Sequence, residues 1–232
     1  MVVDIENTNE VLNFGKKEQN KLSRLSSDVL SSAKAYDLGD MDDIISDLIA
    51  VFDDSTKNKR FNLFRKERSS DLESQVLELA GKLEVSYLNV LNNVHDLEKI
   101  VNETSLILEK LQEKRLEGNQ FVEAIEGEGK ESSDDFEGNV ERFKNALHSL
   151  EVSSNIATQM IARVQTIITS DKVLVRKIKF TIQNTIPLWK NSMLDKRISD
   201  SYATDFVIKE LKGVLGNCQK NLKEHELLQE NH

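Results

Sequence analysis

Five basic residues on one stretch of the chain are the first candidates for chemistry: Lys172, Arg176, Lys177, Lys179 and Lys190. On a helix, Lys172 and Arg176 lie four residues apart and Arg176 and Lys179 three apart, so these three share a face. Their guanidinium and ammonium groups are suited to hold an oxyanion or an anionic partner. The alternative is a solvated helix face whose cations pair with acids on a neighbouring helix.

A second basic cluster occupies residues 57–68 and mixes cations with phenylalanine. Its members are Lys57, Lys59, Arg60, Phe61, Phe64, Arg65, Lys66 and Arg68. Cations beside aromatic rings suit an anionic membrane surface or an acidic protein partner. A wet linker between two helices explains the same composition, so both interpretations stay open.

Acidic residues gather around one glycine without forming a recognisable metal site. Asp37, Asp40, Asp42 and Asp43 surround Gly39. A calcium loop needs a glycine after three oxygen ligands and a bidentate acid later, and that spacing is absent. Capping of a helix N-terminus explains these aspartates better.

The histidines and the cysteine are dispersed along the chain. His95, His148, His225 and His232 include no zinc-like pair four residues apart, and Cys218 is the only cysteine. A single thiol excludes an internal disulfide, and neither a phosphate-binding glycine loop nor a nucleophile elbow occurs. We therefore expect no metal, no cofactor, no catalytic residues and no enzymatic activity.

The composition indicates which elements must carry these residues. The 232 residues include one proline and nine glycines, which favours few, long helices over strands and turns. The net charge of −9 disfavours nucleic acid as a partner. We expect no secretory leader, because the first residues lack a basic segment followed by an apolar run, and no apolar run of about 18–20 residues occurs. A cytoplasmic protein is expected, with membrane association through residues 57–68 as an addition.

The strongest periodic signal begins at Leu72 and alternates spacings of four and three residues. It runs through Leu72, Val76, Leu79, Leu83, Tyr87, Val90, Val94, Leu97, Val101, Thr104, Leu108 and Leu111. Leu77, Leu88, Leu91 and Ile107 widen the stripe, which favours a bundle helix with several partners over an isolated coiled coil. Gly118 is expected to end this helix.

A second stripe predicts the antiparallel partner of the first. It runs through Phe136, Val140, Phe143, Leu147, Leu150, Ser154, Ala157, Ile161, Val164, Ile168, Val175, Ile178, Ile182 and Trp189. Residues 169–171 suggest a break, although the spacing also allows one continuous helix. Pro187 has no N–H, so we expect a kink or a helix end at residues 184–187, with Trp189 in the core or as a docking anchor.

The fold prediction is all-α: an elongated antiparallel helical bundle with two long helices (about 71–116 and 134–188) and shorter flanking helices. The shorter helices are expected at residues 7–35, at 41–52 after a turn with Asp40 as N-cap, and at 205–228. One elongated helical domain covers residues 1–232, with a basic linker at 54–70 and an acidic loop at 126–135.

The proline segment carries a resemblance to a known family. Its most specific part is Ile186, Pro187, Leu188, Trp189 and Lys190, preceded by residues 172–178, Thr181, Ile182, Asn184 and Thr185. Residues 14–15, 37–39 and 63–66 look similar as well. The chain thus resembles the toxic anion resistance protein family (tellurite resistance, TelA family) over roughly residues 14–191, as a C-terminally shortened member.

The resemblance implies a bacterial stress-resistance protein and supplies no catalytic residues. We predict a non-enzymatic helical scaffold or adaptor that contacts protein partners through its helical faces, with heptad edges that permit a homodimer. Two alternatives stay open. One is an oxyanion-binding or sensing protein that uses the basic face at residues 172–190, and the other is a peripheral membrane-surface protein that uses residues 57–68.

Overall fold

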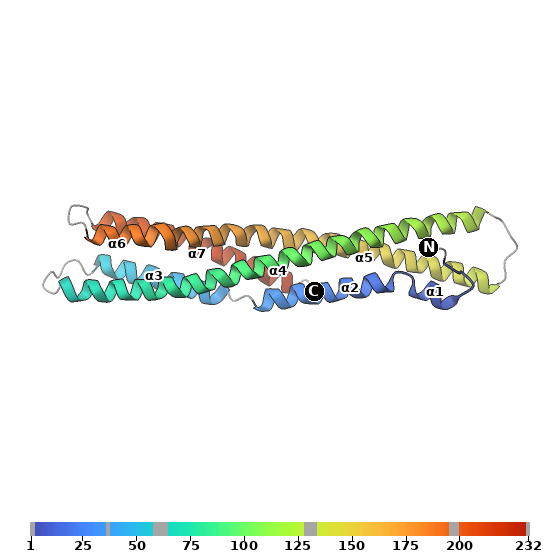
Figure 1. Cartoon of the computed structure of the whole chain (residues 1–232), viewed down its shortest axis with the longest axis horizontal. Coiled ribbons are helices and arrows are strands. Elements are labelled where there is room, and N and C mark those ends of the chain that lie inside the picture. Colours follow the sequence, from blue (N-terminus) through green and yellow to red (C-terminus); the bar gives the residue numbers. More distant parts are fainter. Residues whose placement is uncertain (1–2, 36–37, 58–64, 128–133, 195–199, 231–232) are drawn as a thin grey trace. The chain divides into compact units, whose positions relative to one another are not determined.

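The computed structural model describes residues 3–35, 38–57, 65–127, 134–194 and 200–230. Its elements are α1 (Thr8–Asn13), α2 (Lys16–Ala35), α3 (Leu38–Lys57), α4 (Arg65–Gly127), α5 (Asp134–Phe180), η2 (Thr181–Thr185), α6 (Ile186–Leu194) and α7 (Asp200–Glu230), as labelled in Figure 1. Within these ranges no strand occurs, and the all-α prediction with two long helices is confirmed. No helix in the described part is apolar over enough length to cross a bilayer.

The contacts group the chain into two compact units. Unit 1 comprises Met1–Ser31 and Leu97–Gln165, and unit 2 comprises Ser32–Asp96 and Thr166–His232. The helices α4 and α5 each contribute to both units, because their apolar stripes continue without interruption across the boundaries. The periodic apolar residues of α4 and α5 therefore do not reveal where one unit ends and the other begins. Whether the two units behave as the single domain expected above stays a prediction.

Unit 1 is built from α1, α2, the second half of α4 and the first part of α5. Paired contacts fix the directions. Arg115 and Glu151, Gly118 and Leu147, and Phe121 and Phe143 lie together, so α4 runs antiparallel to α5 as predicted. The amide of Gln19 donates to the hydroxyls of Ser149 and Ser153, and Ser26 donates to Met160 Sδ at 3.3 Å, so α2 runs parallel to α5.

Two glycines allow helices of unit 1 to approach closely. A Cβ at Gly118 would lie 2.3 Å from Leu147 Cδ2, and a Cβ at Gly15 would lie 2.2 Å from Leu150 Cδ2. Gly15 also has a φ of +76°, which separates α1 from α2 within the single helix expected at residues 7–35. Gly118 does not end α4 as predicted, because the space that it leaves is filled by a leucine of the facing helix.

Unit 2 is built from α3, the first half of α4, the end of α5, η2, α6 and α7. The rings of Phe52 in α3 and Trp189 in α6 meet edge to face with centroids 4.9 Å apart. Cys218 in α7 donates to the carbonyl oxygen of Leu38 in α3 over 3.4 Å. The first contact joins α3 to α6 and the second joins α3 to α7, and α3 and α7 pack against each other.

The predicted stripes supply the core of both units. Leu83 and Val94 of α4 are buried, as are Leu147 and Val164 of α5, and Ile161 is half-buried. Residues 169–171 lie inside the continuous α5. The flank of the first stripe differs from the prediction: Leu77, Leu88 and Leu91 are exposed by 48, 44 and 43%. Ile107, the fourth residue of this flank, is buried, so the flank is covered at that position and open at the three leucines.

The long helices extend beyond their predicted ends. The helix expected at about 71–116 runs from Arg65 to Gly127, and the one expected at 134–188 continues as α5, η2 and α6 to Leu194. Of the predicted linker at 54–70, residues 54–57 and 65–70 are helical, and of the predicted loop at 126–135, residues 126–127 and 134–135 are helical. The remainder of both predictions, residues 58–64 and 128–133, lies outside the described residues. Asp40 lies in the first turn of α3 and is not its N-cap.

Candidate functional site

The basic face predicted from the sequence lies on the surface of unit 2. Lys172, Arg176, Lys177 and Lys179 are all exposed on α5. Arg176 turns its Nε–H back to the carbonyl oxygen of Lys172 at 3.1 Å. The fifth candidate, Lys190, lies on α6 and forms an ion pair of 2.6 Å with Glu73 of α4. The structure thus presents four cations to solvent and assigns the fifth to a neighbouring helix.

The motif with the proline follows a local change of hydrogen bonding. Thr181–Thr185 form a π turn, in which the N–H of Ile186 donates to the carbonyl oxygen of Thr181, five residues earlier. Pro187 has no N–H to donate and its ring clashes with a normal α-helical turn, which accounts for the irregularity at this place. The helix does not end there: the backbone remains helical through α6.

The motif divides into an inner and an outer half. Ile186 and Trp189 are buried with 3 and 2% of their surface exposed, whereas Pro187 and Leu188 are exposed. Trp189 packs on Phe52, which supports the core interpretation of this residue and not that of a docking anchor. Within the motif, Pro187 and Leu188 therefore remain exposed to solvent.

A buried polar cluster in unit 2 escaped the sequence analysis. The carboxylate of Asp171 is fully buried in α5, accepts a hydrogen bond of 2.9 Å from Nδ2 of Asn221, and lies 3.1 Å from Nε2 of His225. Asn221 and His225 are themselves 3 and 4% exposed and belong to α7. This arrangement fastens α7 to α5 by polar contacts, because a buried carboxylate is stable only with such partners.

Two periodic signals would have revealed this cluster. Asp171 occupies a core position between Ile168 and Val175, where the stripe calls for an apolar side chain. On α7, buried positions follow the four-three alternation through Val207, Leu211, Val214, Cys218, Asn221, His225 and Leu228. Polar residues at core positions of two helices that face each other are expected to bond to one another.

Cys218 lies among the same buried positions of α7, one turn from Asn221. Burial raises the pKa of its thiol to about 12, and the nearby carboxylates of Asp42 and Asp171 add to the shift. Because the thiolate is the reactive form of cysteine, this thiol is a poor nucleophile and a poor metal ligand in the folded protein. No group of three His, Cys, Asp or Glu side chains with metal-binding geometry occurs among the described residues.

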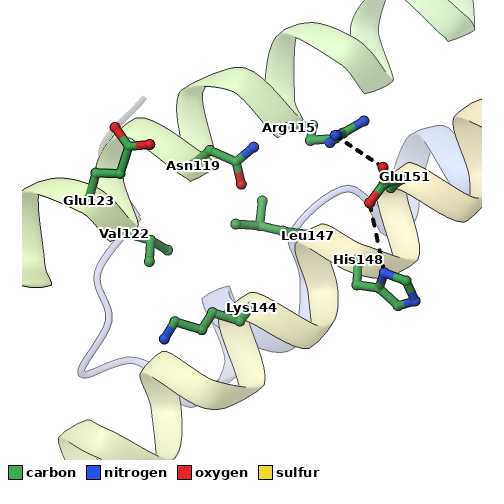
Figure 2. A pocket seen from close by; sticks show the side chains of 8 residues that line it. All are labelled: Arg115, Asn119, Val122, Glu123, Lys144, Leu147, His148 and Glu151. Carbon is green, nitrogen blue, oxygen red and sulfur yellow. Dashed lines mark ion pairs between the residues drawn. The ribbon is translucent and has the colours of Figure 1, made fainter.

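A groove of about 390 Å³ lies in unit 1 between α4 and α5. Figure 2 shows side chains of α4 on one side and of α5 on the other, with Val122 and Leu147 pointing toward each other between them. Glu151 forms an ion pair with Arg115 at 3.1 Å and lies 3.8 Å from Nδ1 of His148, and Lys144 is 2.6 Å from Glu126. The cations around this groove thus already have acidic partners within unit 1.

Half of the second basic cluster lies outside the described residues. Lys59, Arg60, Phe61 and Phe64 belong to that segment. Lys57 ends α3, and Arg65, Lys66 and Arg68 belong to the first turn of α4 by their backbone. The proposed contact of residues 57–68 with a membrane or an acidic partner stays a prediction.

Comparison with known proteins locates the chain among its relatives. A family described as toxic anion resistance protein (TelA) matches residues 66–197. A TelA-like protein of Staphylococcus saprophyticus is 24% identical over 216 residues, and one of Staphylococcus aureus strain MSSA476 is 23% identical over the same length. Each alignment covers 79% of this chain and 57% of the relative, so the chain spans little more than half of their length. No solved structure matches.

Proposed function

We infer the function of this chain from the premise that it belongs to the toxic anion resistance protein (TelA) family, whose match covers residues 66–197. That match contains the proline motif, the exposed cations of α5 and the buried Asp171. The resemblance noted for residues 14–15 and 37–39 lies outside it.

We propose that the chain acts in toxic anion resistance as a non-enzymatic scaffold or adaptor, through contacts made by its helices. The observation that carries the proposal is the exposed apolar line on α4 in unit 2. Leu77, Val85, Leu88 and Leu91 are exposed by 48, 61, 44 and 43%. Three of them, Leu77, Leu88 and Leu91, share one face at helical spacing, which is the pattern that a partner helix packs against.

The experiment replaces two leucines of this line in the full chain. Leu88→Ser with Leu91→Ser should abolish the tellurite tolerance that the chain confers on a sensitive bacterial host, while helix content by circular dichroism stays unchanged. The matched control is Leu106→Ser with Leu116→Ser on the same helix, which alters side chains exposed by 56 and 61% in unit 1. The control should retain tolerance.

A photoreactive amino acid at position 88 identifies the contact. A cross-link to another protein is expected, and a cross-link to a second copy of this chain would make the line a homodimer interface. Equal tolerance of both double variants and the original chain would contradict the scaffold proposal. Turnover of tellurite by the purified chain would contradict its non-enzymatic part, and saturable uptake in equilibrium dialysis would favour the oxyanion-binding alternative.

A further inference from the structure

The region from Lys172 to the end of α6 differs in charge from the rest of the molecule. Residues 172–194 contain five basic residues and no acidic one, in a chain of net charge −9. The acid that directly precedes them, Asp171, turns into the core, where it contacts Asn221 and His225. Its carboxylate is fully buried, so the surface of this region keeps its positive charge.

The cations at the centre of this region are distinguished by the absence of ion pairs to described residues. Arg176, Lys177 and Lys179 are exposed, and none of them forms an ion pair within the part of the chain that the structure describes. Exposed cations on a molecule that is acidic as a whole attract anionic surfaces locally, while the remaining charge disfavours other orientations.

Apolar side chains lie among these cations. Val173, Phe180 and Leu188 are exposed by 40, 51 and 57%. The first two lie seven residues apart, and the last two lie eight apart across the π turn at Thr181–Thr185. Because a π turn holds one residue more than an α-helical turn, both intervals correspond to about two turns, and the three side chains follow one line along the helix.

We propose that this surface, the α5–α6 cationic strip (Arg176, Lys177, Lys179, Val173, Phe180 and Leu188), docks the protein on an anionic lipid bilayer. A helix that lies in a membrane interface combines basic residues with partly inserted apolar side chains, and Phe180 with its flanking cations has this composition. Each basic residue near an anionic membrane strengthens binding roughly fivefold.

A bilayer fits the strip better than an acidic protein does. Three separated apolar side chains cannot form the continuous core of a stable protein interface, which covers about 800 Å² on each partner. A membrane needs no such core, because its headgroups and acyl chains adapt to isolated side chains. The proposal does not depend on the scaffold function, since the apolar line on α4 uses other residues.

Sedimentation of the full chain with vesicles tests the strip. We expect binding to vesicles of equal parts phosphatidylserine and phosphatidylcholine, no binding to phosphatidylcholine alone, and weaker binding as salt rises. The variant Arg176→Gln, Lys177→Gln, Lys179→Gln should bind roughly 100-fold more weakly. Phe180→Ser should remove the part of the binding that persists at high salt.

The matched control carries Lys16→Gln, Lys17→Gln and Lys21→Gln, three exposed lysines of α2 whose loss changes the net charge equally. It should bind vesicles like the original chain, and all variants should keep their helix content. The proposal is overturned if the original chain fails to sediment with anionic vesicles or if the triple variant of the strip sediments equally well. Binding to poly-glutamate without binding to vesicles would overturn it in favour of an acidic protein.

Discussion

Unit 1 and unit 2 use charge and polarity in opposite ways. In unit 1 the core contains the edge-to-face rings of Phe14, Phe121 and Phe143, and the surface cations pair with acids. Arg115 pairs with Glu151, and Lys114 pairs with Glu18 at 3.3 Å. Both cations are therefore paired with acids of the same unit.

Unit 2 also has surface ion pairs, such as Lys190 with Glu73, but it buries one acid next to a group of exposed cations. Asp171 is buried against Asn221 and His225, while Arg176, Lys177 and Lys179 face solvent along the next turns of the same helix. The two units thus differ in where these charged and polar side chains lie, and both surfaces proposed above to contact a partner belong to unit 2. Four experiments test this difference, in order of decreasing expected effect.

The largest effect is expected from Asp171→Ala. Asn221 and His225 then lose the carboxylate that they share in the core, and each buried hydrogen bond to a charged group that is lost costs about 1–3 kcal/mol. We expect the free energy of unfolding of unit 2 to fall by about 3 kcal/mol. Urea unfolding followed by the fluorescence of Trp189, the only tryptophan, measures it. A loss below about 1 kcal/mol would show that the cluster is not a structural lock.

Glycines at two places on α4 should respond in opposite directions. Gly118→Val in unit 1 forces a methyl-bearing side chain against Leu147 and should cost about 1–3 kcal/mol. Gly81→Ala in unit 2 meets nothing within 4 Å and should stabilise by about 1 kcal/mol through helix propensity. Thermal unfolding of both variants compares them. Similar signs at the two positions would contradict the close packing assigned to Gly118.

Cys218 should make unit 2 sensitive to alkali. Its folded pKa of about 12 exceeds the ordinary value of 9.0, so the unfolded chain loses the thiol proton first. The stability contribution is complete below pH 9 and decreases between pH 9 and 12 by at most about 1.4 kcal/mol per pH unit. The urea concentration at the midpoint of unfolding, measured across this pH range, should fall more steeply for the original chain than for Cys218→Ala. Parallel curves for the two proteins would contradict the raised pKa of Cys218.

The smallest effect is expected at the surface of unit 1. Arg115→Gln removes the ion pair with Glu151, whose side chains are 40 and 43% exposed. Exposed pairs contribute about 0–1 kcal/mol, so the melting temperature should hardly change. A large fall in the melting temperature would mean that the surface ion pairs stabilise unit 1 as much as the buried polar cluster stabilises unit 2.

The sequence predicts the apolar framework well, because heptad spacing is a local property that one helix displays by itself. Leu83, Val94 and Leu147 therefore lie where the stripes place them. The exposure of Leu77 and Leu88 was not predictable, since the width of an apolar stripe does not reveal whether a neighbouring helix exists. Gly118 was misinterpreted for the same reason: its role depends on Leu147, a residue of another helix.

The candidate site was predicted only in part. The cations of α5 were found, because their exposure follows from helical spacing against the buried stripe. The pairing of Lys190 with Glu73 and the cluster of Asp171 with His225 join residues far apart in the sequence, which spacing along one helix cannot reveal. Polar residues at heptad positions of α5 and α7 were the available signal.

The π turn at Thr181–Thr185 also decides which way α6 faces. This turn contains one residue more than an α-helical turn. The residues after it are therefore rotated about the helix axis by roughly 100° less than they would be in a continuous α-helix. If the same sequence formed a continuous α-helix, the indole of Trp189 would point away from Phe52. Deleting one residue within Thr181–Thr185 would keep the orientation of Trp189 in a continuous α-helix. The direction in which the motif faces therefore depends more on the number of residues in this turn than on their identity.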